Sequence, residues 1–158
     1  MRELFKDFGT VDYNGFVLTD ISKRVIIEDI VKDNPEFYFE YDIEGFERPE
    51  HLAQDFYNDV KYTWLIFLMN DVIDPIYDWI LPENMLKTFI TDKYGAGNET
   101  AIKYYLNADR DVVFEAGPGT TPVTNTEYEE RINESKRKIR IIRAEYVQAT
   151  MDQLRTAL

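Results

Sequence analysis

The sequence predicts a small α+β fold, and three patterns support this prediction. Residues 37–45, FYFEYDIEG, alternate apolar and polar side chains, which is the period of a half-buried strand. Residues 49–69 carry apolar side chains at helical spacing. Residues 102–106 and 112–114, separated by the polar segment NADRD, are typical of a β-hairpin. The chain therefore mixes short strands with helices.

The first elements are expected to be strands. Residues 23–31, KRVIIEDIV, are rich in β-branched side chains and predict a strand that ends before Asn34 and Pro35. The alternating segment at 37–43 predicts the next strand, which Gly45 closes.

Three helices are expected in the middle of the chain. Pro49 favours a helix start, because a first-turn residue needs no amide hydrogen bond, and Glu50 suits the helix dipole. A second helix contains Trp64 and ends near Asn70. After a predicted short strand at 77–81, YDWIL, a third helix runs from Pro82 through Tyr94 and stops at Gly95.

The C-terminal part is expected to be a linker followed by an arm. Residues 117–124, GPGTTPVT, are rich in turn formers and predict a linker. Thr126 is the expected helix N-cap, with Glu129 in the capping-box position. Ile139 and Ile141 alternate with bases as in a strand, whereas Ile132, Ile139, Ile142 and Tyr146 also fit one long helix. We favour helix, short basic strand, helix.

Composition excludes several classes of protein. With 158 residues, 44% of them hydrophobic and 15% aromatic, the chain is a folding protein and not a disordered tail. It has no cysteine and one histidine, which excludes disulfides, thiolate metal sites and multi-histidine sites. The net charge of −12 repels phosphate backbones and anionic membranes, so no nucleic acid and no membrane partner is expected. The first ten residues resemble no signal peptide, and the apolar run at 63–69 is too short to span a bilayer, so we expect a cytosolic product.

Charge is distributed unevenly along the chain. Residues 1–60 carry a net charge of −9, residues 61–125 carry −4, and residues 126–158 carry +1. Five bases lie within residues 136–143, KRKIRIIR, which predicts docking on acidic groups of the same chain or of a neighbouring subunit. The candidate partner interface combines these bases with apolar residues that follow them. It comprises Lys136, Arg137, Lys138, Arg140, Arg143, Tyr146, Met151 and Leu154.

No motif predicts catalysis, a cofactor or a metal. Asp71, Asp74 and Asp78 lack the alternate spacing of a calcium loop, and Pro75 interrupts them. GAGN at 95–98 follows a helix, where it is typical of a helix stop and not of a phosphate-binding loop. His51 is expected to be structural. The many aromatic residues between 56 and 79 predict a core, with stacking of sugars on exposed rings as the alternative.

Residues 41–82 resemble a LysM-type module. The expected pattern has an aromatic strand, a glycine, a Leu-Ala helix, an aromatic residue, a second helix ending in Asn, and a closing strand before Pro. The corresponding positions are Tyr41 and Ile43, Gly45, Leu52 and Ala53, Phe56 and Tyr57, Leu65 to Met69, Asn70, and Ile80 to Pro82.

More specifically, the segment resembles the LysM-like baseplate wedge subunit of contractile-tailed bacteriophages. Three further groups of residues carry this resemblance. They are Arg48, Pro49, Glu50, Leu52 and Ala53; Trp64, Asn70 and Asp71; and Asp74, Pro75, Tyr77 and Trp79. The implied fold is a small LysM-like β-α-α-β core with flanking strands, a hairpin and a C-terminal helical arm. Its implied core residues are Leu52, Ala53, Tyr57, Trp64 and Trp79.

The resemblance implies a division of the chain and a function. We expect an N-terminal arm at 1–36, the LysM-like core at 37–95, a hairpin and linker at 96–125, and a basic arm at 126–158. The implied protein is a non-enzymatic structural subunit of the virion. It is assembled in the host cytoplasm and joins neighbouring baseplate wedge proteins, present in multiple copies, into a sixfold ring around the tail.

The alternative is a LysM-type module that binds peptidoglycan or another glycan. The sugar-holding turns of such modules are replaced here by Gly45, Phe46 and Glu47 and by Tyr77 and Asp78. These departures favour the structural interpretation.

Overall fold

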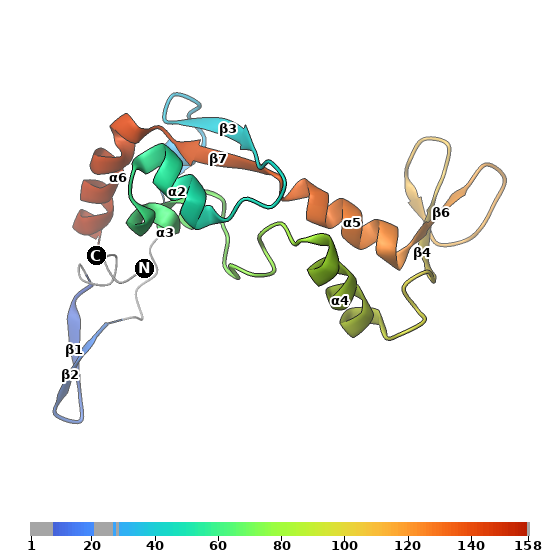
Figure 1. The fold of residues 1–158 in the computed structure, drawn as a ribbon, viewed down its shortest axis with the longest axis horizontal. Coiled ribbons are helices and arrows are strands. Elements are labelled where there is room, and N and C mark those ends of the chain that lie inside the picture. The colour runs from blue at the N-terminus through green and yellow to red at the C-terminus, as the bar shows by residue number, and fades with distance from the viewer. Residues whose placement is uncertain (1–7, 21–26, 28, 158) are drawn as a thin grey trace. The chain divides into compact units, whose positions relative to one another are not determined.

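The computed structural model describes residues 8–20, 27 and 29–157 and divides the chain into two compact units (Figure 1). Unit 1 comprises Met1–Pro75 and Lys138–Leu158, and unit 2 comprises Ile76–Arg137. Helices and strands occur in both units, which confirms the α+β class.

Unit 1 begins with a two-stranded hairpin. β1 (Thr10–Tyr13) and β2 (Phe16–Thr19) pair in antiparallel fashion. The turn residues Asn14 and Gly15 have φ angles of 54° and 82°, the left-handed conformation that a two-residue Asn-Gly turn requires. The predicted strand at 23–31 lies largely outside the described residues. Its described end belongs to the helix α1 (Asp29–Lys32), so the strand prediction is wrong there.

The sheet of unit 1 joins segments that are far apart in the sequence. β3 (Tyr38–Asp42) pairs in antiparallel fashion with β7 (Lys138–Ile142), and Tyr41 lies opposite Ile139. The alternating pattern at 37–43 is thereby confirmed as a strand. α5 (Asn125–Ser135), β7 and α6 (Ala144–Ala157) confirm the preferred order of helix, strand, helix.

Two helices follow β3, as predicted. α2 (Pro49–Tyr57) begins at the proline, and Asn58 ends it in a left-handed conformation. A short 3-10 helix, η2 (Val60–Tyr62), leads into α3 (Thr63–Met69). The buried core of unit 1 combines Ile27 with residues from α1, α3, both strands and α6. It contains Ile27, Val31, Tyr38, Trp64, Leu65, Met69, Ile142 and Val147.

The closing strand differs from the one expected. The order β3, α2, α3, β7 is β-α-α-β, but its last strand comes from Lys138–Ile142 and not from Ile80–Pro82. Residues 77–79 form a turn and bends and residues 80–81 are irregular, so the strand prediction there is wrong. At the end of this segment the Leu81 backbone pairs with a side chain and not with a strand, because Asn133 Oδ1 accepts from the Leu81 N–H at 2.8 Å and Asn133 Nδ2 donates to the Leu81 carbonyl at 2.9 Å.

Unit 2 contains two helices and a three-stranded sheet. α4 (Glu83–Tyr94) confirms the third predicted helix. β4 (Ile102–Leu106) pairs with β5 (Val112–Val113), as predicted, and also with β6 (Thr121–Thr124). The predicted linker therefore contains a strand. Leu81, Leu86 and Ile90 form a core against which Phe89 and Tyr94 pack.

The N-cap of α5 lies two residues before the expected one. Thr124 accepts from the Glu127 amide at 3.2 Å, and the Glu127 carboxylate accepts from the Thr124 amide at 2.7 Å, which completes a capping box. Thr126 donates its hydroxyl to the Glu99 carbonyl at 2.9 Å instead.

The expected segments at 37–95 and 126–158 do not coincide with the two units. α5 belongs to unit 2, whereas β7 and α6 belong to unit 1. Because Ile139, Ile141 and Ile142 are buried, residues 138–158 are part of the fold of unit 1 and not an arm separate from it.

Candidate interaction surfaces

The predicted basic interface is divided between the two units. Lys138, Arg140 and Arg143 lie on or next to β7 in unit 1, whereas Lys136 and Arg137 lie at the end of unit 2.

Each base of the unit 1 group has a contact within that unit. Lys138 forms an ion pair with Glu40 at 2.7 Å, which raises the pKa of Lys138 and lowers that of Glu40. Arg140 lies 5.0 Å from the centre of the Tyr38 ring. Arg143 donates from Nε to the Glu36 carbonyl at 3.1 Å. All three bases remain exposed, so these contacts leave their outer faces accessible.

The two bases of unit 2 also have partners. Lys136 donates from Nζ to the Tyr77 carbonyl at 2.6 Å, and burial lowers the pKa of its ammonium group. Arg137 pairs with Glu134 at 2.6 Å. The basic segment was expected to dock either on the same chain or on a neighbouring subunit. The contacts described here are all with the same chain. The partner interface stays a prediction.

The apolar residues of the predicted interface lie on α6. Tyr146 packs edge-on against Phe37, with 4.9 Å between ring centres, and is half-buried. Met151 is also half-buried against the core of unit 1. The side chain of Leu154 lies outside the described residues.

The residues expected in the LysM-like core are mostly buried. Leu52, Ala53 and Trp64 lie inside unit 1, and Trp79 is buried in unit 2. Tyr57 is half-buried, and burial of its hydroxyl raises its pKa. The LysM-like detail of the fold stays a prediction.

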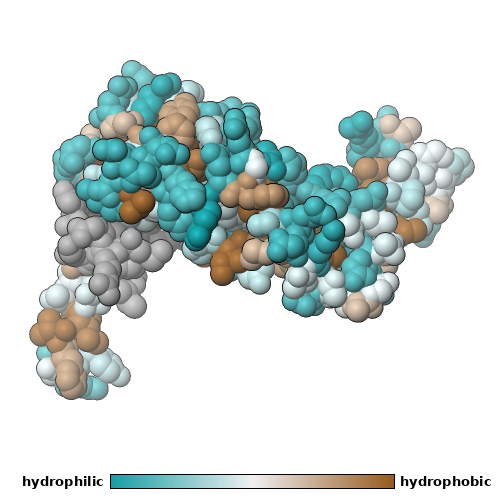
Figure 2. All heavy atoms as spheres, viewed as in Figure 1, coloured by the Kyte–Doolittle hydropathy of each residue, from teal (hydrophilic) through white to brown (hydrophobic). Residues whose placement is uncertain are grey.

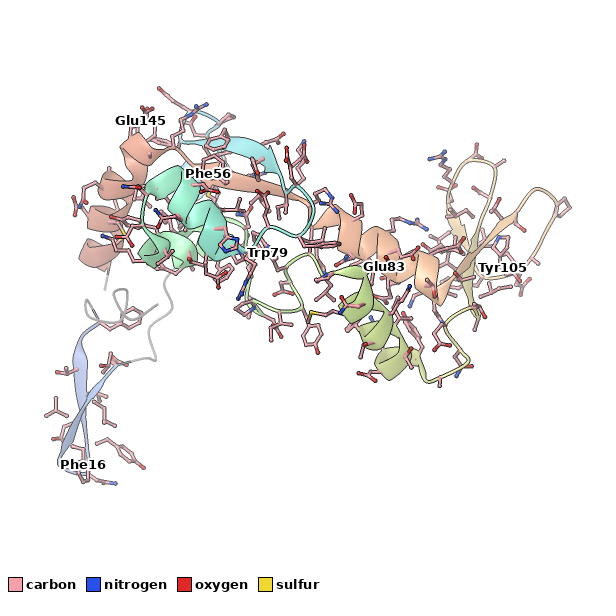
Figure 3. The ribbon with its side chains drawn as sticks, in the orientation of Figure 1. Phe16, Phe56, Trp79, Glu83, Tyr105 and Glu145 are labelled. Atoms are coloured by element: carbon pink, nitrogen blue, oxygen red, sulfur yellow. The ribbon has the colours of Figure 1, made fainter. Side chains whose placement is uncertain are left out.

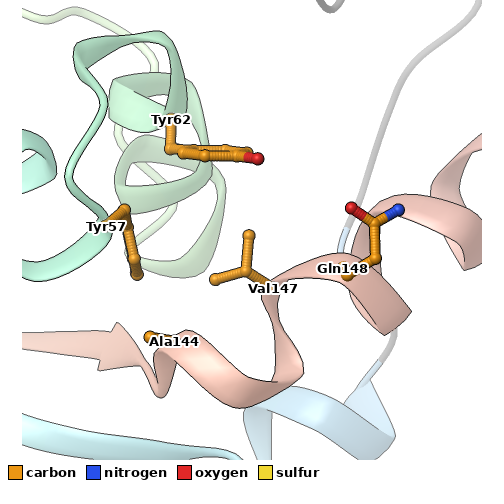
Figure 4. Close-up of a pocket in the computed structure, with 5 residues that line it drawn as sticks. All are labelled: Tyr57, Tyr62, Ala144, Val147 and Gln148. Atoms are coloured by element: carbon orange, nitrogen blue, oxygen red, sulfur yellow. The ribbon is translucent and has the colours of Figure 1, made fainter.

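One small pocket lies in unit 1 between α2, η2 and α6. Its volume is about 160 Å³, and it is lined by Tyr57, Tyr62, Ala144, Val147 and Gln148 (Figure 4). Ligand pockets for drug-sized molecules measure roughly 300–1,000 Å³. The pocket also lacks a charged side chain, so it offers no acid–base pair for chemistry.

A buried carboxylate connects α4 with α5 in unit 2. Glu129 is only 4% exposed and accepts from Lys93 Nζ at 2.8 Å and from the Tyr94 hydroxyl at 2.6 Å. Burial alone would raise the pKa of Glu129, but these hydrogen bonds and the Lys93 charge outweigh it and hold the pKa below its usual value. The network is structural, because every member faces another side chain of the same unit.

The described residues contain no group of three or more potential metal ligands. Asp71 pairs with Lys32, and His51 is exposed on α2. In the same part of the chain, no helix has the length and apolar character needed to cross a bilayer.

The hairpin β1–β2 is an exposed surface that the sequence interpretation missed. Tyr13, Phe16 and Val17 are 65%, 70% and 73% exposed. Figure 2 shows hydrophobic side chains gathered on this hairpin at the lower left. The available signal was the Asn14-Gly15 pair between two β-prone segments, VDY and FVL.

Comparison with known proteins identifies the family. Residues 4–116 match the family described as base plate wedge protein 53. Baseplate wedge protein gp53 of Enterobacteria phage T4 is 25% identical over 113 residues, a match that covers 66% of this chain and 58% of the T4 protein. The match thus spans less than two thirds of that relative. Because the family match covers most of the chain, from β1 through α4 to β5, the chain belongs to the base plate wedge protein 53 family.

Proposed function

We propose that this chain is a structural subunit of a phage tail baseplate and joins neighbouring wedges into a sixfold ring through protein–protein contacts. The observation that carries the proposal is the family match over residues 4–116. The T4 relative is, by its name, a baseplate wedge protein. The site of action is therefore the virion tail, and the partners are other wedge proteins.

The division into two units supports a joining role. A subunit that joins two neighbours needs at least two contact surfaces, and separately packed units can carry one each. Unit 1 exposes apolar side chains on the β1–β2 hairpin, and unit 2 exposes Phe114, which is 81% accessible. Exposed aromatic residues are enriched at protein interfaces.

The basic segment of unit 1 is a further candidate surface. Lys138, Arg140 and Arg143 are exposed, whereas the chain as a whole carries a charge of −12. A positive strip on an acidic subunit suits an acidic surface on a neighbour, and such complementarity chiefly raises the rate of association.

The contacts of Glu47 give the glycan-binding alternative little support. Glu47 lies in the turn that takes the place of a sugar-holding turn of LysM modules. Its carboxylate accepts hydrogen bonds from the Tyr41 hydroxyl at 2.8 Å and from the Glu44 amide at 2.9 Å. The hydrogen bond to Glu47 raises the pKa of Tyr41 to about 12. The polar groups of the turn thus already bind one another.

An omission experiment tests the proposal. The other wedge proteins of the same phage are co-expressed with and without this chain, and the products are separated by size-exclusion chromatography and imaged by negative stain. We expect rings with the chain and only separate wedges without it. Rings that form equally well in its absence would contradict a joining role, and co-sedimentation of the chain with cell-wall sacculi would then favour the glycan-binding alternative.

A further inference from the structure

The β1–β2 hairpin has one apolar face and one mixed face. The register pairs Val11 with Leu18 and Tyr13 with Phe16, and directly paired residues point to the same side of a sheet. These four residues form what we term the hairpin face. Val17 lies opposite Asp12 and therefore belongs to the other side.

The turn holds the aromatic pair at the tip of the hairpin. The Gly15 amide donates to the Asp12 carboxylate at 3.1 Å, and the Asp20 amide donates to the Gly9 carbonyl at 2.8 Å at the open end. Figure 3 shows Phe16 next to the turn. The hairpin face is thus presented by a short, hydrogen-bonded element whose tip is aromatic.

An uncovered face of this kind needs a partner. A hairpin of two strands is at best marginally stable in water, and large aromatic side chains serve as anchors when they enter a pocket of another protein. Between residues 10 and 19 the only charged side chain is Asp12, which already accepts a hydrogen bond in the turn. The hairpin is therefore suited to a dry, apolar groove.

A second copy of the chain does not fit this face. From their exposed fractions, the four side chains present roughly 400 Å² in total, whereas a stable interface buries about 800 Å² per partner. Two copies would also bring together net charges of −12 each. A different protein that lacks this net charge avoids the repulsion, and further contacts with it supply the remaining area.

We propose that the hairpin face inserts into an apolar groove on a different subunit of the same baseplate. This inference rests on the proposed function and adds the element that makes the contact and the chemistry of its partner. The hairpin then acts as a hydrophobic anchor within a larger interface.

The test replaces the aromatic tip within the full chain. The double variant Tyr13→Thr and Phe16→Thr keeps β-forming side chains but removes both rings. The matched control is Val17→Thr, at an equally exposed position on the opposite side of the hairpin. Each chain is co-expressed with the other wedge proteins of the same phage, and the amount of each wedge protein that co-purifies is measured. Melting temperatures of the isolated chains establish that folding is unchanged.

We expect the double variant to retain its melting temperature and to lose at least tenfold in co-purification of one wedge protein, and Val17→Thr to lose less than twofold. Equal co-purification by wild type and double variant would overturn the hairpin proposal and leave the joining role intact. Failure of the wild-type chain to co-purify with any wedge protein would overturn both. A wild-type dimer that the double variant abolishes would assign the face to a second copy, and flotation with lipid vesicles that the double variant abolishes would assign it to a membrane. Either result would also overturn the proposal.

Discussion

Asn70 connects the end of α3 with β7 through both atoms of its amide group. Nδ2 donates to the carbonyls of Ile66 and Arg140, each at 2.8 Å, and Oδ1 accepts from the Arg140 amide at 2.7 Å. The side chain thus satisfies backbone groups of β7 that β3 does not reach. This role explains an Asn at the position where the sequence predicted the end of a helix.

Removing the amide is expected to destabilise unit 1. Asn70→Ala leaves backbone groups on Arg140 without their partner, which costs about 1–3 kcal/mol of unfolding free energy. Asn84→Ala, at an exposed position of α4, is the control and should change stability by less than about 0.5 kcal/mol. Urea denaturation measures both. Equal midpoints for the two variants would show that the Asn70 hydrogen bonds contribute nothing.

Trp64 is the largest side chain in the core of unit 1. Its burial confirms the sequence interpretation of this aromatic residue as core. Trp64→Ala is expected to lower the unfolding free energy by about 3–5 kcal/mol, the range for truncation of a buried aromatic residue. Phe46→Ala, which changes an exposed ring of the same unit, should leave the melting temperature almost unchanged. A melting temperature that Trp64→Ala shifts by less than a degree would contradict the packing described here.

At the scale of elements, α4 and α5 are connected by the Glu129 network. Since the folded protein lowers the pKa of Glu129 from its ordinary 4.5, the folded state binds fewer protons than the unfolded state near that pH. The stabilisation is therefore complete above about pH 5 and is lost as the pH falls through the lowered value.

Glu129→Gln is expected to lower the urea midpoint at pH 7 and to reduce the further loss of stability as the pH falls below about 5. The reason is that the variant lacks the charge that Lys93 stabilises. Glu130→Gln changes an exposed carboxylate one residue further along α5 and is the control. If the urea midpoints of wild type and Glu129→Gln changed with pH in the same way, the role assigned to this carboxylate would be refuted.

Local sequence patterns predicted most elements of the fold. Alternation identified β3, the proline at 49 marked the start of α2, and the polar NADRD segment marked the β4–β5 turn. The partner of β3 was not predictable in the same way, because β7 follows it only after four α-helices, a 3-10 helix and three strands, and pairing over such a distance leaves no local pattern. β6 was hidden because Gly and Pro precede it and Pro122 lies within it.

The interaction surfaces were less predictable than the fold. The basic segment was visible as charge, but its split between two units and its contacts with Glu40, Glu36 and Tyr77 depend on tertiary structure. The hairpin face was overlooked because Asn14 and Gly15 interrupt its apolar residues and by themselves indicate only a loop. The structure shows that the two flanking segments pair as strands.

At the scale of the whole molecule, the C-terminal segment completes unit 1. Deletion of residues 138–158 removes the only strand that pairs with β3 in the described part of the chain, and with it four buried apolar side chains. These are Ile139, Ile141, Ile142 and Val147. We expect the truncated chain to lose the cooperative unfolding of unit 1, measured by circular dichroism during heating.

A pair of point variants checks the same prediction without truncation. Ile141→Ala, at a fully buried position of β7, should cost about 2–5 kcal/mol, whereas Ile132→Ala on the exposed face of α5 should cost little. A truncated chain that melts as cooperatively as the full chain would show that residues 138–158 are a separate arm after all.

The proposed joining role requires one copy of this chain to contact two neighbouring wedges. A cryo-electron-microscopy reconstruction of the assembled baseplate measures this directly, because it shows which subunits touch each copy. We predict that unit 1 and unit 2 together contact proteins of two adjacent wedges around the sixfold ring, with the hairpin face covered. A reconstruction in which every contact of the chain lies within a single wedge would contradict it.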